Sequence, residues 1–502
     1  MSTNLSHPLA PRLVLRADGN EHIGLGHLMR LLALAEQLRF IFEESVFLLQ
    51  TPTEPVRALL RAAGLTVVEL PAGPLPAEAA ATLPPLLHPT DVLVLDGYGF
   101  DYAYQLAVRP LVARLVCLDD LHAFPFAADL VLNPAGGVSA DSYDLRRAGA
   151  RLLAGPAYAS LRPEFAAVTT MPPAVLPTTV LLCLGGADPR QLTHATATAL
   201  LALPGVAQVH AVVGAAYAAW DALRDWAAAY VGRLTLHRAL PAFELAALMR
   251  RCGAAVLSPS TISYEYCATG GGLLLTLPTA NNQHDLDHFL RAEGLALPYT
   301  AAPNVLTTTE APRLAWQMRQ AQQRYFDGQQ GQRLRQELAA LLVPAAPLRL
   351  RPVQAADSSQ LLAWTNDPVT RRQSFDPAPV PATQHAAWLA DQMAQPAQRL
   401  LLLAETAHTS EPAGLVRFAL AANGRQATLS YQLGPAWRGR GWAAALLLAG
   451  TRAALAYWPQ LAEVRGEVKT DNGASVRAFE RAGYQEAAST GPAGRRIFVW
   501  VA

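Results

Sequence analysis

The sequence predicts an α/β protein in which two doubly wound parallel sheets are followed by a smaller α+β domain. From residue 13 to about residue 165, short apolar segments alternate with helical segments, as in a parallel sheet covered on both faces. The alternation restarts after a Pro-rich passage, and after a second such passage the strand candidates group around few helices. A chain of 502 residues suffices for three domains of about 100–200 residues. The predicted boundaries are 1–165, 166–342, a linker at 343–352, and 353–502.

The first unit opens with an apolar strand at residues 13–15, a Gly-rich loop and an amphipathic helix. Gly24, Gly26 and His27 fall at the start of this helix, where unpaired N–H groups favour an anionic ligand. The positive end of the helix dipole disfavours imidazolium and leaves the ring able to take a proton, which suits a general base. From these residues alone, a histidine that caps the helix or packs in the core is the alternative.

The loop matches neither of two common phosphate-binding patterns. A dinucleotide fingerprint requires glycine where this chain has Met29, and a P-loop requires a Gly-Lys-Ser/Thr ending that is absent. Ligands of parallel sheets bind beyond the carboxyl ends of the strands, although a polar residue there often only caps the next helix. The polar residues at such ends are Asp18, Asp96, Asp119, Asp120 and Asn133.

Composition excludes several classes of protein. The 40 basic and 39 acidic residues are dispersed, which argues against a nucleic-acid binder. The N-terminus lacks the pattern of a signal peptide, and no apolar run approaches the roughly 18 residues of a membrane span, so we expect a cytoplasmic protein without membrane contact. The four cysteines form no CxxC pair and are predicted to be core thiols, and no cluster has the spacing of metal ligands.

The second unit carries features expected of a nucleotide site. Gly185 and Gly186 follow an apolar strand and precede a helix, so their backbone is able to approach a phosphate. Ser260 or Thr261 is a plausible N-cap of a later helix whose start would hold a diphosphate. Glu265, one turn further, offers two oxygens to a ribose diol; a solvated helix residue is the alternative.

Residues 12–342 contain, in order, motifs that resemble the UDP-sugar hydrolase family of pseudaminic acid biosynthesis. They are RADGNEHIGLGHLMR, LDGYGFD, CLDDL, GPAYASLRPEF, CLGGADPRQLT and STISYE followed by TANNQ. The resemblance implies a two-domain glycosyltransferase-B fold and His27 as the residue that activates water. It also implies Asp18, Gly24 and Gly26 on the sugar side, and Gly186, Glu265, Asn282 and Gln283 on the UDP side. Because UDP leaves as a stabilised diphosphate, one base and phosphate donors suffice without a metal.

The third domain contains a further Gly-rich loop, Arg438-Gly439-Arg440-Gly441-Trp442-Ala443, between a strand and a long helix. This loop and EVKTDNGASVRAFERAGY resemble motifs of GCN5-related N-acetyltransferases (GNATs), in which such a loop binds the pyrophosphate of acetyl-CoA. The resemblance implies acetyl-CoA as cosubstrate, held by Arg438, Gly439, Arg440, Gly441, Ala443 and Asn472. Many relatives have a tyrosine that acts as the general acid at the position of Phe479 in this chain. Tyr484 as acid and Glu405 as base are the substitutes we consider.

Together the resemblances predict a bifunctional enzyme that acts on a UDP-linked amino sugar. The third domain would acetylate the 4-amino group with acetyl-CoA, and the first two units would hydrolyse off UDP at the anomeric C–O bond with inversion. The product would be 2,4-diacetamido-2,4,6-trideoxy-L-altrose, the precursor of pseudaminic acid. Two alternatives are a glycosyltransferase fused to an acetyltransferase, and a UDP-sugar sensor fused to a protein acetyltransferase.

Overall fold

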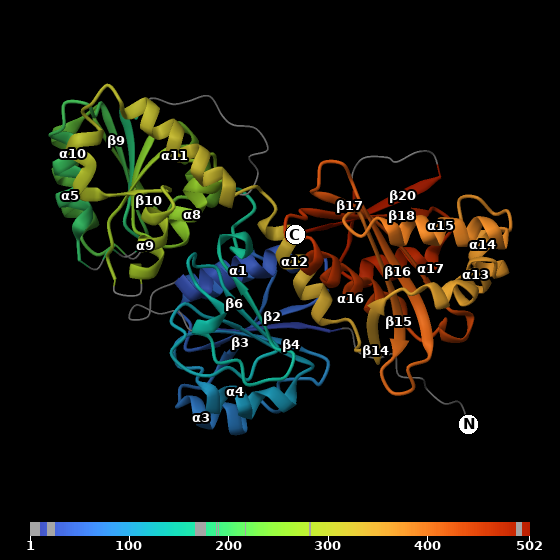
Figure 1. The fold of residues 1–502 in the computed structure, drawn as a ribbon. Coiled ribbons are helices and arrows are strands. Elements are labelled where there is room, and N and C mark those ends of the chain that lie inside the picture. The colour runs from blue at the N-terminus through green and yellow to red at the C-terminus, as the bar shows by residue number, and fades with distance from the viewer. Residues whose placement is uncertain are drawn as a thin grey trace. The chain divides into compact units, whose positions relative to one another are not determined.

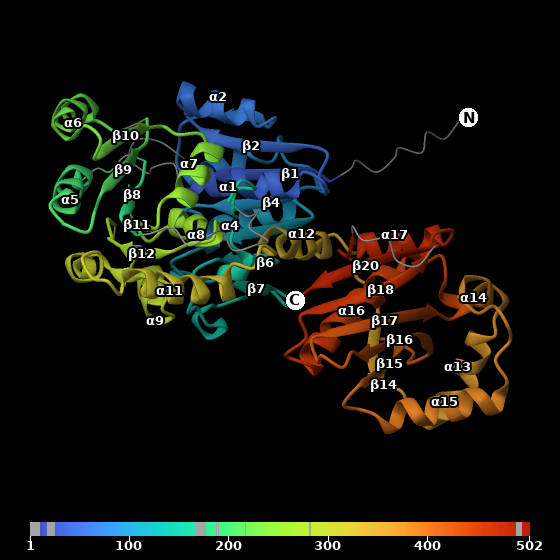
Figure 2. The same cartoon turned by 90° about the horizontal axis from the view of Figure 1, so that it is seen from above.

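The computed structural model describes residues 11–17, 26–165, 177–186, 188, 190–215, 217–280, 283–487 and 494–502. The chain divides into two compact units, one up to Leu334 and one from Arg335 to Ala502. Figures 1 and 2 show their elements from two directions.

The first sheet of unit 1 is entirely parallel and has the order β3-β2-β1-β4-β5-β6-β7. Its inner strands are mostly apolar because helices cover both faces, although β1 includes Arg16, which is buried and paired with Glu78. The sequence analysis did not predict β7, a short strand that begins with an arginine. The strands are β1 Leu13–Ala17, β2 Ser45–Gln50, β3 Thr66–Leu70, β4 Val92–Asp96, β5 Arg114–Leu118, β6 Leu130–Asn133 and β7 Arg151–Ala154. The helices are α1 Gly26–Leu38, α2 Glu54–Ala62, α3 Leu75–Ala77 and α4 Tyr102–Val108.

The second sheet of unit 1 is also parallel, with the order β10-β9-β8-β11-β12-β13. The hydrophobic core of this second sheet includes Ala159, Leu161 and Phe165. The sequence analysis placed these residues in the first domain, which it ended at residue 165. The strands are β8 Thr179–Cys183, β9 Gln208–Val213, β10 Leu234–Arg238, β11 Ala254–Leu257, β12 Leu273–Thr276 and β13 Leu297–Pro298. The helices are α5 Leu192–Leu201, α6 Trp220–Ala227, α7 Ala242–Arg251, α8 Thr261–Ala268, α9 His284–Ala292, α10 Ala302–Val305 and α11 Ala311–Tyr325.

The segment from Glu310 to Leu342 forms two helices. After α11 the chain turns at Gly328, whose φ of 78° lies in the left-handed region, and resumes as α12, Gln330–Leu341. The glycine between the two helices is the reason for the break.

Unit 2 is built on a mixed sheet with the order β14-β15-β16-β17-β18-β20-β19. The predicted linker at 343–352 requires correction, because β14 pairs antiparallel with β15 and is an edge strand of this sheet. The strands are β14 Leu348–Pro352, β15 Arg399–Thr406, β16 Pro412–Leu420, β17 Gln426–Leu433, β18 Glu463–Lys469, β19 Gln485–Glu486 and β20 Arg495–Val501. The helices are α13 Ser358–Thr365, α14 Pro368–Gln373, α15 Ala382–Ala394, α16 Trp442–Tyr457 and α17 Gly473–Arg481.

The two faces of this sheet follow the alternation of side chains along its strands. Leu400 and Leu402 of β15 belong to the core that includes residues of α16 and α17. Leu401 and Leu403 belong to the smaller core with residues of α13 and α15. Because successive side chains of a strand point to opposite faces, one apolar run supports both layers.

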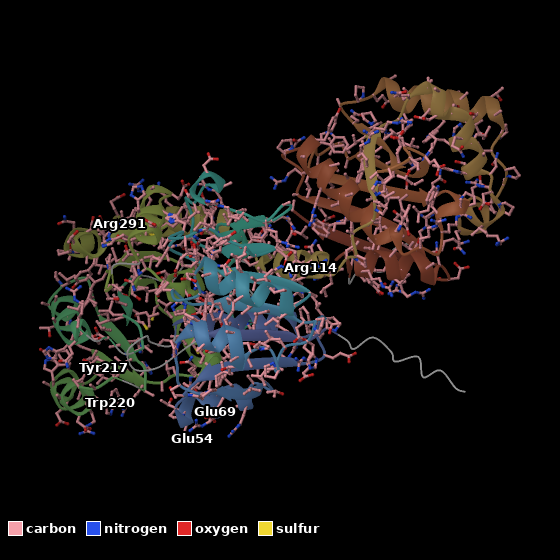
Figure 3. The ribbon with its side chains drawn as sticks, turned by 90° about the horizontal axis from the view of Figure 1, so that it is seen from below. Glu54, Glu69, Arg114, Tyr217, Trp220 and Arg291 are labelled. Carbon is pink, nitrogen blue, oxygen red and sulfur yellow. The ribbon has the colours of Figure 1, made fainter. Side chains whose placement is uncertain are left out.

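At the surface of unit 1, Glu54 of α2 and Glu69 of β3 lie close together, and Arg57 donates to both (Figure 3). All four cysteines are buried and free, which confirms their assignment as core thiols. Across the part of the chain that the structure describes, we find no helix with the length and apolar character needed to cross a membrane.

Candidate active sites

The connectivity of the first sheet brings the start of α1 beside the end of β4. Strand β1 lies between β2 and β4, so successive connections leave it in opposite directions. At such a switch point the carboxyl ends of the strands form a crevice that commonly binds ligands. His27, in the first turn of α1, and Asp96, the last residue of β4, meet there.

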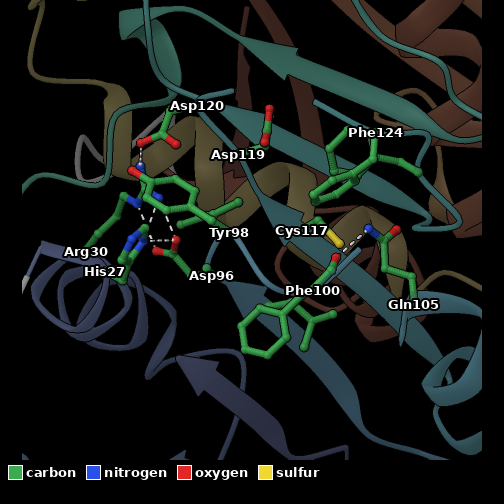
Figure 4. Close-up of a pocket in the computed structure, with 14 residues that line it drawn as sticks. His27, Arg30, Asp96, Tyr98, Phe100, Gln105, Cys117, Asp119, Asp120 and Phe124 are labelled. Carbon is green, nitrogen blue, oxygen red and sulfur yellow. Dashed lines mark hydrogen bonds and ion pairs between the residues drawn. The ribbon is translucent and has the colours of Figure 1, made fainter. Parts of the chain in front are cut away.

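His27 and Asp96 form a buried dyad that Arg30 holds in place (Figure 4). The Nδ1 atom of His27 lies 2.7 Å from Oδ1 of Asp96. Arg30 donates through Nη2 to the same oxygen at 2.5 Å and through Nε to Oδ2 at 2.8 Å. Burial alone would raise the pKa of Asp96, but the charge of Arg30 and the hydrogen bonds from Arg30 and His27 hold it below its usual value. Since ionised Asp96 accepts from Nδ1–H, the neutral His27 ring has its lone pair on Nε2.

The cavity at this dyad is lined by residues of the first sheet and its connections. Tyr98 packs edge-on against His27, with ring centroids 4.8 Å apart, and Asp120 lies 3.4 Å from Arg30 (Figure 4). The lining does not include the residues predicted for the UDP side. Of the predicted sugar-side residues, Gly26 is the exposed first residue of α1, whereas Asp18 and Gly24 lie outside the described residues.

In the second sheet, β8 lies between β9 and β11, so its switch point coincides with the second Gly-rich loop. Gly185 has a φ of 100°, and the carbonyl of Gly186 accepts from the N–H of Gly214 at 2.8 Å. The buried carboxylate of Asp188 accepts from the N–H groups of Leu192 and Thr193 at the start of α5. This helix start is therefore already capped by the protein.

The start of α8 differs, because its N-cap Ser260 makes no capping hydrogen bond through its side chain. The first-turn N–H groups of a helix have no intrahelical acceptor and suit an anion. Glu265 lies one turn further along α8 and is buried, not solvated. Both of its carboxylate oxygens accept from Arg162, at 2.7 Å from Nε and 2.8 Å from Nη2. Sequence reasoning did not predict this ion pair.

The predicted TANNQ contacts fall partly outside the structure. Asn282 lies outside the described residues. The Oε1 atom of Gln283 accepts from the N–H groups of Thr279 and Ala280, at 2.7 and 3.3 Å. Gln283 thus caps its own turn.

Unit 2 contains a cavity of about 690 Å³ lined by α13 to α15, β16 to β18 and the start of α16. Strands β17 and β18 pair in parallel only as far as Leu429 and Gly466. Beyond that point, Ser430 to Leu433 and Glu467 to Lys469 continue without pairing to each other and line the cavity. The opening between the two strands therefore begins after Leu429 and Gly466.

The Gly-rich loop before α16 reaches its shape through two glycines. Gly439 and Gly441 have φ values of 76° and 78°, and Gly441 is an N-cap that provides no side chain for the helix start. Arg438 donates to Asp367 at 2.6 Å and to Thr370 at 2.8 Å, so it fastens the loop to the start of α14. Arg440 lies over the ring of Trp437, 4.7 Å from its centroid.

Two predicted acid–base residues are not at the cavity. Tyr484 is buried and its hydroxyl pairs with that of Thr451. Glu405 pairs with Arg351 at 2.6 Å and with Arg349 at 3.1 Å. Neither residue lines the cavity. We therefore withdraw both as acid–base candidates, because each is engaged in the core or at the β14 edge.

The cavity is lined by Asn472, which the sequence analysis assigned to acetyl-CoA, and by two residues that sequence reasoning missed, Tyr431 and His385. Asn472, the N-cap of α17, accepts from the N–H of Ser475, whose Oγ lies 3.0 Å from the hydroxyl of Tyr431. Burial raises the pKa of Tyr431, which keeps the phenol protonated, and the hydrogen bond from Ser475 opposes this shift. Tyr431 and His385 both line the cavity. The alternation of side chains along β17 could have indicated the face of the sheet on which Tyr431 lies. The sequence alone did not show where β18 diverges from β17.

Comparisons with known proteins bear on unit 2. Residues 347–485 match the family described as "Acetyltransferase (GNAT) domain". Similar solved structures include the spermidine N-acetyltransferase of Vibrio cholerae in complex with CoA and spermine, with 17% identity, 30% of this chain and 93% of that chain covered, and a TM-score of 0.27. An aminoglycoside acetyltransferase in complex with coenzyme A and kanamycin has 18% identity, coverage of 31% and 94%, and a TM-score of 0.27. No curated protein matches the chain significantly.

No group of three or more His, Cys, Asp or Glu side chains that could hold a metal ion occurs within the described ranges. The parallel sheets of unit 1 are Rossmann-like. Residues 347–485 form a GNAT acetyltransferase domain.

Proposed function

We propose that the protein is a bifunctional enzyme of nucleotide-sugar metabolism. Unit 2 acetylates the 4-amino group of a UDP-linked 4-amino-4,6-dideoxy sugar. Unit 1 then hydrolyses the anomeric C–O bond with inversion and releases UDP and 2,4-diacetamido-2,4,6-trideoxy-L-altrose, the precursor of pseudaminic acid. The match at residues 347–485 supports the first step, and the sequence resemblance over residues 12–342 supports the second.

The observation that carries the hydrolase proposal is the buried dyad of His27 and Asp96. Asp96 accepts from Nδ1–H and fixes the tautomer, so Nε2 takes a proton from water as the water oxygen attacks the anomeric carbon. The anomeric C–O bond breaks as the new bond forms on the opposite face, and UDP leaves with the electron pair. Arg30 keeps Asp96 ionised as the imidazolium forms, because its guanidinium contacts both carboxylate oxygens.

The second sheet supplies the features that support UDP binding. The start of α8 has no side-chain cap, so its N–H groups suit the diphosphate. The carboxylate of Glu265 keeps lone pairs beyond those used by Arg162, and these suit ribose hydroxyls. Gly186 lies at the same end of the sheet, after β8.

The cavity of unit 2 supports acetyl transfer to an amine. The N–H groups around Gly439 and Gly441, at the start of a 16-residue helix, suit a pyrophosphate. The unpaired edge from Ser430 onward suits the amide groups of pantetheine, which add to an open strand edge by backbone hydrogen bonds. The thioester would then lie near Tyr431, whose hydroxyl is a proton donor for the departing thiolate.

The test is to incubate the protein with the UDP-4-amino sugar in the presence and absence of acetyl-CoA, with no glycosyl acceptor. We expect release of free CoA, UDP and the diacetamido sugar when acetyl-CoA is present. Release of UDP only after addition of an acceptor alcohol would instead identify a glycosyltransferase. Tight binding of UDP-sugar without turnover, together with acetylation of a protein, would identify a sensor fused to a protein acetyltransferase.

A further inference from the structure

His385 is buried in the wall of the unit 2 cavity with no hydrogen-bond partner for its ring. The residue is 3% exposed and lines the cavity, and neither Nδ1 nor Nε2 has a partner in the described part of the chain. A buried polar group left without a partner costs about 1–3 kcal/mol, so proteins rarely retain one that has no other use. An apolar side chain would fill this position at lower cost.

The position of His385 on α15 explains why its ring faces inward. Leu389, one turn later on the same face, belongs to the small core with Leu361 and Leu403. Trp388 packs beside the histidine, with ring centroids 5.5 Å apart. These contacts fix the imidazole against the cavity and leave its nitrogens unused.

The charges around His385 favour a neutral ring. Arg417 of β16 lines the same cavity, and its guanidinium lies 4.9 Å from the ring centroid of Trp388. Burial, and next the positive charge of Arg417, lower the pKa of His385. The cavity-lining residues of α13, Leu361 and Thr365, carry no charge. Arg371 of α14 and Asp376 in the turn after it also line the cavity. The other charged residues of the lining are Arg438, Glu467 and Lys469.

The same contacts connect His385 to the place where the thioester is expected. Arg417 donates to the hydroxyl of Ser430 at 2.5 Å. Ser430 is the first residue of β17 beyond its pairing with β18. His385, Trp388 and Arg417 therefore line the same cavity as the open edge, and Arg417 links them to Ser430.

We propose that His385 is the proton acceptor for the amine substrate of acetyl transfer. This inference rests on the acetyltransferase function proposed for unit 2 and assigns its catalytic base. The ammonium form of the substrate gives one proton to the unprotonated ring nitrogen. The free amine then attacks the thioester carbonyl, the C–N bond forms, and the C–S bond breaks. The CoA thiolate takes a proton from the Tyr431 hydroxyl, and the second proton of the former amine leaves the amide nitrogen and restores the phenol. The imidazolium returns its proton to solvent.

The test compares His385→Gln and His385→Ala with the wild-type protein and with His408→Gln, whose histidine is exposed between β15 and β16. Release of free CoA is followed from pH 6 to about pH 10, at saturating acetyl-CoA and varied amine. For both His385 variants we expect kcat/KM at neutral pH to fall by about 10²–10⁴-fold, the usual effect of losing a general base. The deficit should shrink as the pH rises, because the amine then deprotonates in solution. KM for acetyl-CoA and the behaviour of His408→Gln should match the wild type.

Two results would overturn the assignment. One is a His385→Gln variant with the pH profile of the wild type. The other is a loss of equal size at every pH in a variant with unchanged melting temperature, which would indicate a binding role. If the wild type leaves the UDP-4-amino sugar untouched but acetylates another primary amine, the proposed substrate is wrong and His385 is tested on that amine. A wild type that acetylates no amine would overturn both proposals.

Discussion

The Nδ1 atom of His27 lies 2.7 Å from Oδ1 of Asp96, although 69 residues separate them in the chain. Asp96 is itself held by Arg30 through both oxygens. A histidine oriented by a buried carboxylate is the arrangement that prepares an imidazole to accept a proton on its other nitrogen. The dyad therefore argues against a role for His27 that is confined to capping the helix.

The first prediction concerns the orientation of His27. Asp96→Asn keeps the size of the side chain but no longer stabilises the imidazolium, so UDP release should slow by about 10²–10⁴-fold. His27→Asn should cause a loss of similar size. Acetyl transfer by unit 2 is the internal control and should be unchanged in both variants. Wild-type rates of UDP release in Asp96→Asn would remove the dyad from the mechanism.

The second prediction concerns stability in acid. The folded-state pKa of Asp96 is lowered, so its stabilising effect is complete above the ordinary value of about 3.9 and is lost as the pH falls through the folded-state value. The difference in unfolding free energy between the wild type and Asp96→Asn should therefore be constant near neutral pH and shrink in strong acid. Denaturant titrations at several pH values measure it. A difference that does not change down to about pH 2 would contradict the assigned ion pair.

The third prediction concerns the buried pair of Arg162 and Glu265. Arg162→Met leaves a buried carboxylate without its partner and should lower the unfolding free energy by about 3–5 kcal/mol. The double variant with Glu265→Leu should regain much of that loss, because no isolated charge remains. Glu265→Gln should weaken UDP binding by about 10–150-fold through loss of a charged hydrogen bond of roughly 1.5–3 kcal/mol. Calorimetry with UDP measures this effect, and unchanged affinity would exclude the ribose role.

The fourth prediction separates two tyrosines of unit 2. Tyr431→Phe removes a phenol that lines the cavity and should lower kcat for acetyl transfer by about 10²–10⁴-fold. Tyr484→Phe removes a hydroxyl paired with Thr451 in the core. It should cost only about 0.5–1.5 kcal/mol of stability and leave kcat unchanged. The reverse pattern would restore Tyr484 as the acid.

Much of the fold was predictable because inner parallel strands are continuous apolar runs. The strand β2, Ser45–Gln50, is one such run, with apolar residues from Val46 to Leu49. Strands that were missed are short or lie at an edge, such as β13 with two residues and β14, where arginines interrupt the apolar pattern. Such strands cannot be recognised from the order of apolar and polar residues, because they are defined by their hydrogen bonds to neighbouring strands.

The sites were less predictable, because their contacts join distant parts of the chain. Asp96 was recognised as a residue at a strand end, but its pairing with His27 depends on the order of strands in the sheet. Glu265 was expected to be free, and its partner Arg162 lies 103 residues away. Tyr484 was considered as the acid because Phe479 replaces the tyrosine of many relatives, whereas the cavity is bordered by Tyr431 where β17 and β18 diverge.

The most direct test of the bifunctional account is one reaction in ¹⁸O-labelled water with the UDP-4-amino sugar and acetyl-CoA, followed by mass spectrometry of all products. Attack of water on the anomeric carbon leaves the original oxygen on the phosphate. We therefore expect unlabelled UDP, free CoA, and a sugar that carries the new acetyl group. Label in UDP would show cleavage at phosphorus, and an acetylated UDP-sugar that persists without release of UDP would show that unit 1 is not a hydrolase. Either result would contradict the account.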